Sequence, residues 1–403
     1  MRQVYRLSPS LILFGAVFAA ILVTSTAAAV AAESPPEALI EGNTAFALKL
    51  YGELGSAEGN LFFSPYSISS ALGMTYAGAR RNTATEMKEA LHFQLDQTLL
   101  HSSFKRLSHE LAANARKADQ KLNIANGLCL TGGDVSNDFK TLLKDNYDAE
   151  FFSGGLDKIN GWVKEKTEGK IEKILDGLDR NSVCVILNAI YFKGAWKSPF
   201  KKSDTHDAPF NVSERKQVTV PFMYQKSGFQ ILTEQDFQAA SIPYRGKRLS
   251  MVILLPLEAD RLAKLEERMT GQNVRQWLAE LDKTTIREIK LYMPKFKLET
   301  GYDLVPSCKA LGMKEAFQMG EADFSGMGWP KGDLWISQIK HKAFVEVNEE
   351  GTEAAAATAV GMVQTSLRNY PVFRADHPFL FLIRDNQTGT ILFMGRMVDP
   401  DKK

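Results

Sequence analysis

The residues most able to do chemistry in this sequence are its histidines, cysteines and acidic side chains. His109 and Glu110 begin like the H-E-x-x-H helix of zinc proteases, but the fifth residue is Ala113, so a second imidazole ligand is missing. Cys129, Cys184 and Cys308 form no C-x-x-C pair, and each is predicted to pack as a small hydrophobic residue. No G-x-S-x-G sequence and no phosphate-binding glycine loop occurs. The sequence therefore predicts no enzyme activity, no metal site and no cofactor.

The segment 344–373, FVEVNEEGTEAAAATAVGMVQTSLRNYPVF, has an unusual composition. Its four consecutive alanines favour a helix, yet the residues before Asn348 alternate like a strand. From Ala354 to Leu367 there is no charged residue and no proline. As a strand, the segment would carry small side chains on one face, at Thr352, Ala354, Ala356, Thr358, Val360 and Met362. The other face would carry Glu353, Ala355, Ala357, Ala359, Gly361 and Val363, and we expect it to stay exposed because it includes a carboxylate.

Such a segment is suited to begin as an exposed loop and to enter a sheet later as a central strand, where proline would be excluded. A plain linker would instead carry Ser, Pro, Lys and Glu. A short exposed helix and a disordered loop are the alternatives.

The N-terminus has the pattern of a secretory signal peptide. Arg2 and Arg6 precede an apolar run of about 13 residues and the small residues Val30-Ala31-Ala32. We predict cleavage near Ala32, so that residues 1–32 are a signal peptide and the protein is secreted, or periplasmic in a bacterium. An uncleaved membrane anchor is less consistent with the pattern, because a span needs about 20 apolar residues.

The formal net charge of the chain is +2. This small charge argues against a nucleic-acid partner that is bound through the overall electrostatic field of the protein.

The elements that position the unusual segment follow from the hydrophobic patterns. Helical patterns dominate the first half, at residues 37–54, 67–79, 83–93 and 159–175. Strand patterns follow at residues 183–196, 217–225, 237–257, 287–299 and 343–350, and residues 379–400 predict a hairpin through Asn386–Gly389. With no repeat or linker, this order predicts one α+β domain, residues 33–403, with antiparallel sheets.

Several long motifs, in one order, resemble the serpin family from about residue 37 to the C-terminus. They are VNEEGTEAAAATA at 347–359, NLFFSPYSISSALGMTYAGARRNTATEM at 60–87, LNAIYFKGAWKSPF at 187–200, LSMVILLP at 249–256 and DHPFLFLIRDNQTGTILFMGRMVDP at 376–400. The resemblance implies the serpin fold, with helices, three mainly antiparallel sheets and an exposed reactive-centre loop at about 351–371. It also implies a mechanism. A target protease cleaves the loop, and insertion of the loop as a new central strand of a sheet traps the acyl-enzyme.

The resemblance also assigns residues to roles. The hinge of the loop matches Gly351, Thr352, Glu353, Ala354, Ala355, Ala356, Ala357 and Thr358. A polar cluster beneath the opening of the sheet, called the shutter, matches Ser64, Ser67, Asn188 and His341. The place where insertion starts, called the breach, matches Trp196 and an ion pair between Lys295 and Glu349.

In inhibitory members of the family that the sequence resembles, the scissile residue usually lies 14 residues after the hinge glycine, so the resemblance implies the reactive bond Thr365–Ser366, with Leu367 and Arg368 as alternatives. Small Thr365 favours an elastase-like or subtilisin-like serine protease as partner, whereas Arg368 would suit a trypsin-like enzyme; a cysteine protease is also possible. We expect a monomer, without a membrane partner after signal removal.

The second hypothesis is a non-inhibitory carrier or chaperone. Non-inhibitory members of the family tend to have bulky, charged or proline residues in the hinge, whereas the hinge residues of this sequence are small throughout.

Overall fold

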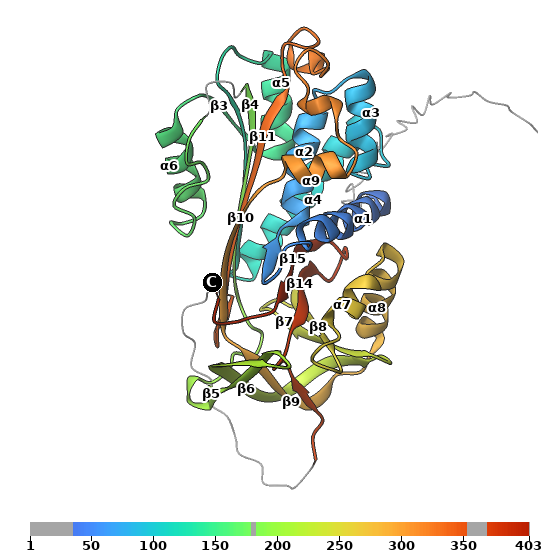
Figure 1. The fold of residues 1–403 in the computed structure, drawn as a ribbon, viewed down its shortest axis with the longest axis vertical. Helices are drawn as coiled ribbons and strands as arrows, with labels where there is room; N and C mark the ends of the chain where they lie inside the picture. The colour runs from blue at the N-terminus through green and yellow to red at the C-terminus, as the bar shows by residue number, and fades with distance from the viewer. Residues whose placement is uncertain (1–34, 179–182, 353–368, 403) are drawn as a thin grey trace, which may run out of the picture. The chain divides into compact units, whose positions relative to one another are not determined.

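A six-stranded sheet carries most of the residues singled out above (Figure 1). The computed structural model describes residues 35–178, 183–352 and 369–402, and residues 35–403 form one compact unit. The strands of this sheet are β2 (Lys121–Leu130), β3 (Glu150–Ser153), β4 (Cys184–Ala195), β10 (Phe296–Asp303), β11 (Ile336–Val347) and β12 (Gly351–Thr352). Their spatial order is β10-β11-β12-β4-β2-β3, so that β11 and β4 lie at the centre.

A second sheet has nine strands. They are β1 (Leu61–Phe63), β5 (His206–Ser213), β6 (Lys216–Thr233), β7 (Phe237–Pro243), β8 (Leu249–Pro256), β9 (Arg287–Pro294), β13 (Val372–Arg374), β14 (Phe379–Asp385) and β15 (Ile391–Met397). The long strand β6 pairs with β9 through residues 222–229 and with β7 through residues 230–233. The three sheets of the serpin fold therefore correspond to the six-stranded sheet and to two parts of the nine-stranded sheet that share β6.

The helices are α1 (Glu37–Leu54), α2 (Pro65–Tyr76), α3 (Arg81–Ala90), α4 (Gln97–Lys117), α5 (Asn137–Tyr147), α6 (Leu156–Lys166), α7 (Leu262–Glu267), α8 (Gly271–Lys283) and α9 (Val305–Ala310). Figure 1 shows α6 on one face of the six-stranded sheet and α2, α4 and α5 on the other side. Helix α2 begins at Pro65, which suits the first helical position, and the Ser64 hydroxyl accepts a hydrogen bond from the Ser67 amide at 3.2 Å.

Helix α6 and the residues after it bury the face of the sheet that they cover. Ile159 and Val163 of α6, with Ile171, Ile174 and Leu175, form a cluster with Val185, Leu187, Ala189 and Tyr191 of β4, whose side chains are at most 1% exposed. The sequence pattern suggested one buried and one exposed face for a strand entering this sheet. Beside β4, the second face is instead buried over most of its length.

Most of the predicted elements are confirmed, but one helix is shorter than predicted and several strands were not predicted. Helix α1 has the predicted bounds, and β14 and β15 form the predicted hairpin. The helix predicted over residues 159–175 ends at Lys166, because Glu168 and Gly169 adopt left-handed backbone with φ of 53° and 78°. Strand β2 was not predicted, since the first half of the sequence was interpreted as mainly helical.

Candidate functional site

The candidate site lies where β12 separates the two central strands. Thr352 is paired with Val347 of β11 on one side and with Gly194 of β4 on the other. Further along, β11 and β4 pair directly and in parallel, from Phe344 opposite Tyr191 to Ile336 opposite Cys184. The sheet is therefore open at one end, where β12 occupies the gap, and closed along the rest of the seam between β11 and β4.

Gly351 is required by the close approach of the two strands. Its φ is +155°, and a Cβ atom built there would lie 2.1 Å from the carbonyl oxygen of Gly194 and 2.7 Å from the Cα of Ala195. Both are backbone atoms, so they cannot move aside as a flexible side chain would. The turn that leads to it is held by Asn348, whose side-chain oxygen accepts the amides of Glu350 at 3.0 Å and Gly351 at 3.3 Å.

Thr352 is buried in an aromatic environment. It is 0% exposed, and its hydroxyl lies 2.7 Å from the Tyr244 hydroxyl. The Tyr244 ring stacks on Trp196 with 4.5 Å between centroids, and the Trp196 indole donates to the Asn348 carbonyl at 2.9 Å. These contacts fix both ends of the turn against β4, and they place Trp196 beside the end of the sheet that β12 occupies.

An ion pair closes the same turn from outside. The Lys295 ammonium lies 3.0 Å from one Glu349 carboxylate oxygen and donates to the other at 3.1 Å, and Thr205 donates to that carboxylate at 2.9 Å. Burial works to raise the pKa of Glu349, but the hydrogen bonds from Lys295 and Thr205, together with the lysine charge, leave it below its ordinary value. Glu349 is thus held ionised beside the opening.

The four residues predicted for the shutter lie together beneath the closed seam. His341 and Asn188 are directly opposite each other across β11 and β4, with 2.6 Å between Nδ1 and Oδ1. The Asn188 amide donates to the Ser67 hydroxyl at 2.6 Å, and the Ser64 amide donates to Nε2 of His341 at 3.2 Å. The cluster therefore joins α2 to both central strands across the seam that an inserting strand would have to open.

His341 is neutral in this cluster. Its Nε2 accepts from the Ser64 amide, so the proton is on Nδ1 and is donated to Asn188. Burial lowers the pKa of His341 to about 3. A second proton, on Nε2, would face the Ser64 N–H donor, so protonation and this hydrogen bond exclude each other.

A family model described as Serpin (serine protease inhibitor) matches residues 41–400. The chain belongs to the serpin family. Leukocyte elastase inhibitor from Equus caballus is 40% identical to this serpin over 385 residues, which cover 90% of this chain and 100% of that relative. Serpin B6 from Macaca fascicularis is 40% identical over 383 residues, with the same coverage. The family and these relatives support protease inhibition by the serpin mechanism.

Solved structures give the same family. Native tengpin, a thermophilic serpin, superposes with a TM-score of 0.82 at 30% identity, covering 91% of this chain and 95% of that chain. Human thyroxine-binding globulin complexed with thyroine superposes with a TM-score of 0.81 at 29% identity, covering 90% of this chain and 98% of that chain. Similar folds thus occur in an inhibitor-family protein and in a binding globulin, so the fold alone does not distinguish these tasks.

Several residues of the site were not predicted from the sequence. Asn126 of β2 accepts from Asn188 at 2.7 Å and donates to Ser70 at 3.2 Å, which extends the shutter to a third strand. An asparagine within the apolar strand KLNIANGLCL was the available signal, but β2 was missed. Tyr244 and Thr205 gave no sequence signal, because their role depends on contacts across the fold.

Other predicted residues lie outside the described part of the chain. These are the signal segment 1–32, the hinge residues 353–358 and Thr365, Ser366, Leu367 and Arg368. Among the residues that the structure does describe, no group of His, Cys, Asp or Glu has the arrangement of a metal site. No helix in those same ranges is long and apolar enough to cross a membrane.

Proposed function

We propose that β12 is the start of the inserting strand and that this serpin traps its protease when the rest of the loop follows into the seam. The observation that carries the proposal is the geometry of β12. Its two residues already pair with both β11 and β4 in antiparallel register, while the seam beyond Phe344 and Tyr191 is closed. Insertion would therefore extend an existing pairing rather than begin a new one, which avoids the costly first step of strand association.

The register of β12 predicts where each later residue would lie. Because Thr352 is opposite Gly194 and the strands are antiparallel, Thr358 would come opposite Asn188. By the same count on β11, where Thr352 is opposite Val347, Thr358 would also come opposite His341. The inserted strand would place a hydroxyl between the two shutter residues whose mutual hydrogen bond it breaks. A hydroxyl donates and accepts, so Thr358 can replace both partners.

The energetics favour insertion once the loop is cut. The direct pairing between β11 and β4 would be exchanged for two new pairings, one on each side of the inserted strand. A net gain of about ten hydrogen bonds, each worth about 1 kcal/mol, rivals the stability of an ordinary domain. The uncut protein would then be a kinetically trapped state, and inhibition would be a race between insertion and hydrolysis of the acyl-enzyme.

The same register bears on the reactive bond, for which we propose Thr365–Ser366. Met362 would come opposite Cys184, the first residue of β4, so a strand that ends at Thr365 would extend only three residues past β4. Full insertion of residues 352–365 moves the bound protease by about 45 Å. Cleavage after Leu367 or Arg368 would lengthen the tether and weaken the distortion of the protease.

The target class follows from the proposed bond. Small Thr365 fits an elastase-like or subtilisin-like serine protease, and leukocyte elastase inhibitor is among the relatives. Trypsin-like enzymes acting at Arg368, and cysteine proteases, are the alternative targets.

We further propose that residues 1–32 direct secretion and that residues 33–403 are a single domain without enzyme activity. The family match begins at residue 41, after the proposed signal.

One experiment tests the function directly. The protein is incubated with elastase, subtilisin, trypsin, chymotrypsin and papain, and each mixture is analysed on an SDS gel. A covalent complex with an elastase-like or subtilisin-like enzyme, and release of a C-terminal fragment that begins at Ser366, are the expected results. Cleavage of the loop by every enzyme without any complex would contradict inhibition and favour the carrier hypothesis.

A further inference from the structure

Strand β2 has an edge that no other strand of the described chain covers. β3 pairs with β2 only through residues 127–130, whereas β4 pairs with β2 along its whole length, from Lys121 to Leu130. On the side away from β4, residues 122–126 therefore take part in no strand pairing within the described ranges. Over five residues, or about 16 Å, outward backbone N–H and C=O groups remain available to another strand.

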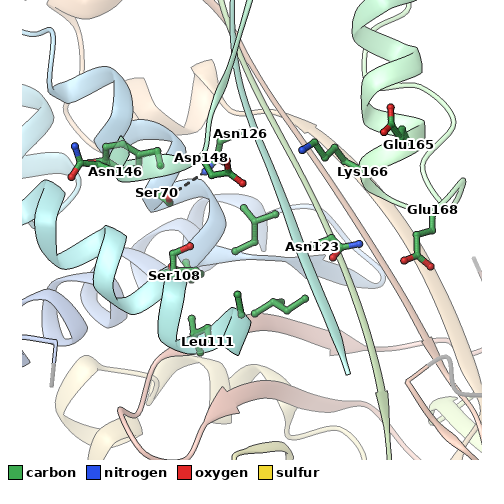
Figure 2. Close-up of a pocket in the computed structure, with 15 residues that line it drawn as sticks. Ser70, Ser108, Leu111, Asn123, Asn126, Asn146, Asp148, Glu165, Lys166 and Glu168 are labelled. Atoms are coloured by element: carbon green, nitrogen blue, oxygen red, sulfur yellow. Dashed lines mark hydrogen bonds between the residues drawn. The ribbon is translucent and has the colours of Figure 1, made fainter. Parts of the chain in front are cut away.

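A cavity of about 340 Å³ lies along this edge (Figure 2). Four residues of the edge line it, together with Leu111 and Ala112 of α4 and residues 146–148 at the end of α5. Glu165, Lys166 and Glu168, at the end of α6 and just after it, line the other side. This volume is within the range of about 300–1,000 Å³ for small-molecule and cofactor sites. The cavity is thus a slot between two layers, with a strand edge as its floor.

The side chains around the slot are polar and not all of them are paired. In the described part of the chain, the side chains of Asn123 and Lys166 have no hydrogen-bond or ion-pair partner. Figure 2 shows Glu165, Lys166 and Glu168 together on the α6 side and Asp148 across the slot. Glu168 is bound to Lys121 at 2.6 Å, so the unpaired charges at the rim, on Asp148, Glu165 and Lys166, are predominantly acidic.

We propose that this slot binds an extended peptide segment of a partner protein, which adds to the six-stranded sheet as a short strand on β2. Alternating backbone donors and acceptors are complementary to another backbone, and this is the recognition mode of strand addition. Leu111, Leu122 and Ile124 offer apolar contacts for alternate side chains of the peptide. The acidic rim favours basic residues at the positions between them.

The location of the slot connects the bound peptide to insertion, and this step rests on the proposed function. Asn126 lines the slot and also accepts from Asn188 in the shutter. Both sides of the seam are bonded to neighbouring elements: Thr300 of β10 donates to the Phe62 carbonyl of β1 at 2.6 Å, and Asn188 of β4 donates to the Ser67 hydroxyl of α2 at 2.6 Å. The slot lies against β2 on the β4-β2-β3 side, so a bound peptide would meet any outward movement of that side when a strand about 4.8 Å wide enters the seam. A peptide held between β2 and α4 opposes that movement and slows insertion.

The test uses a fluorescein-labelled hexapeptide, Thr-Lys-Val-Lys-Val-Thr, and a copy with the same side chains in which alternate backbone nitrogens are methylated. Fluorescence anisotropy with the full-length protein should show binding of the first peptide and a loss of at least tenfold in affinity for the second, which lacks the donors for strand pairing. Equal binding of the two peptides, or no binding of either, would overturn the proposal.

Two variants locate the site. Ala112→Phe fills the slot from α4 and should abolish binding, whereas Ala113→Phe, one residue along the same helix and outside the lining, should not. Because a variant of α4 could misfold, Glu165→Gln at the exposed rim provides a second test and should weaken binding by about two- to fivefold. Binding that is unaffected by both Ala112→Phe and Glu165→Gln would place the peptide elsewhere and refute the assignment.

The effect on inhibition is measured separately from binding. At saturating peptide, the number of inhibitor molecules consumed per protease molecule should rise, and the methylated peptide should leave it unchanged. An unchanged ratio with the bound peptide would disprove the coupling to insertion. A protein that binds the peptide but never forms a protease complex would refute the proposed function while the binding site stands.

Discussion

Replacing Thr352 with arginine tests whether β12 is the starting point of insertion. Thr352 is fully buried between β11 and β4, and its hydroxyl bonds to Tyr244. The pairing of this residue with two strands and one hydroxyl is worth a few kcal/mol, at about 1 kcal/mol for each hydrogen bond. Burying a guanidinium group without a partner costs several kcal/mol. The charge should therefore expel residue 352 from the sheet, and insertion would lose its preformed first step.

The expected loss of inhibition in Thr352→Arg follows from the change in the rate of insertion. If re-entry of the arginine raises the barrier by about 3 kcal/mol, insertion slows roughly a hundredfold. Hydrolysis of the acyl-enzyme then wins the race, and the variant becomes a substrate. The fold should persist, because the expelled residue leaves the closed seam from Phe344 to Ile336 intact.

The assay compares the covalent complex with the cleaved inhibitor on an SDS gel, using the elastase-like enzyme. Thr352→Ser is the matched control, since it keeps the hydroxyl that contacts Tyr244 and should inhibit like the parent protein. Thr352→Arg should be cleaved at the same bond with little or no complex. If it instead inhibits one-to-one at the parent rate, β12 does not have to be buried for insertion, and the argument from its register fails.

Three further predictions follow from the same geometry. Thr358→Val should lower the thermal midpoint of the loop-cleaved protein, because the shutter loses its replacement hydroxyl, whereas Thr358→Ser should not; an equal midpoint for both, measured by circular dichroism, would contradict the predicted register. Cleavage within residues 353–365 by a non-target protease should raise the midpoint of the parent protein sharply, and an unchanged midpoint would exclude a trapped native state. Because the pKa of His341 is about 3 when folded and about 6.5 when unfolded, the unfolded state binds the extra proton between these values. Stability should therefore fall as pH decreases from 6.5, by about 2 kcal/mol at pH 5, and urea denaturation should show a smaller loss for His341→Gln.

The sequence predicted the parts of this site that depend on short-range patterns. The alternation at residues 343–350 gave the end of β11, and the helical pattern at residues 67–79 gave most of α2. The resemblance to the serpins placed His341 and Asn188 in one polar cluster, which no local pattern contains, and their direct pairing came from the structure. The direction of their hydrogen bond required the structure, because it is the Ser64 amide that fixes the histidine tautomer.

What the sequence could not give is the environment of each face of a strand. Glu353 suggested that one face of the segment would be exposed, since a carboxylate avoids burial. By register, however, Glu353 would lie opposite Lys193 near the open end of the sheet, where Lys193 is only partly buried. The later residues of that face would lie beside Tyr191, Ala189 and Leu187, which α6 and the residues after it bury.

This difference explains why the segment is small on both faces and not on one. A strand that enters between β11 and β4 passes between two packed layers, α2 and the shutter on one side and α6 on the other (Figure 1). A large side chain on either face would have to displace one of these layers, at a cost typical of overpacking, about 1–3 kcal/mol for each site. Alanine and glycine at 355, 357, 359 and 361 avoid that cost on the α6 face. The composition that first seemed to describe an amphipathic strand therefore describes a strand that must become buried on both sides while the helices around it stay in place.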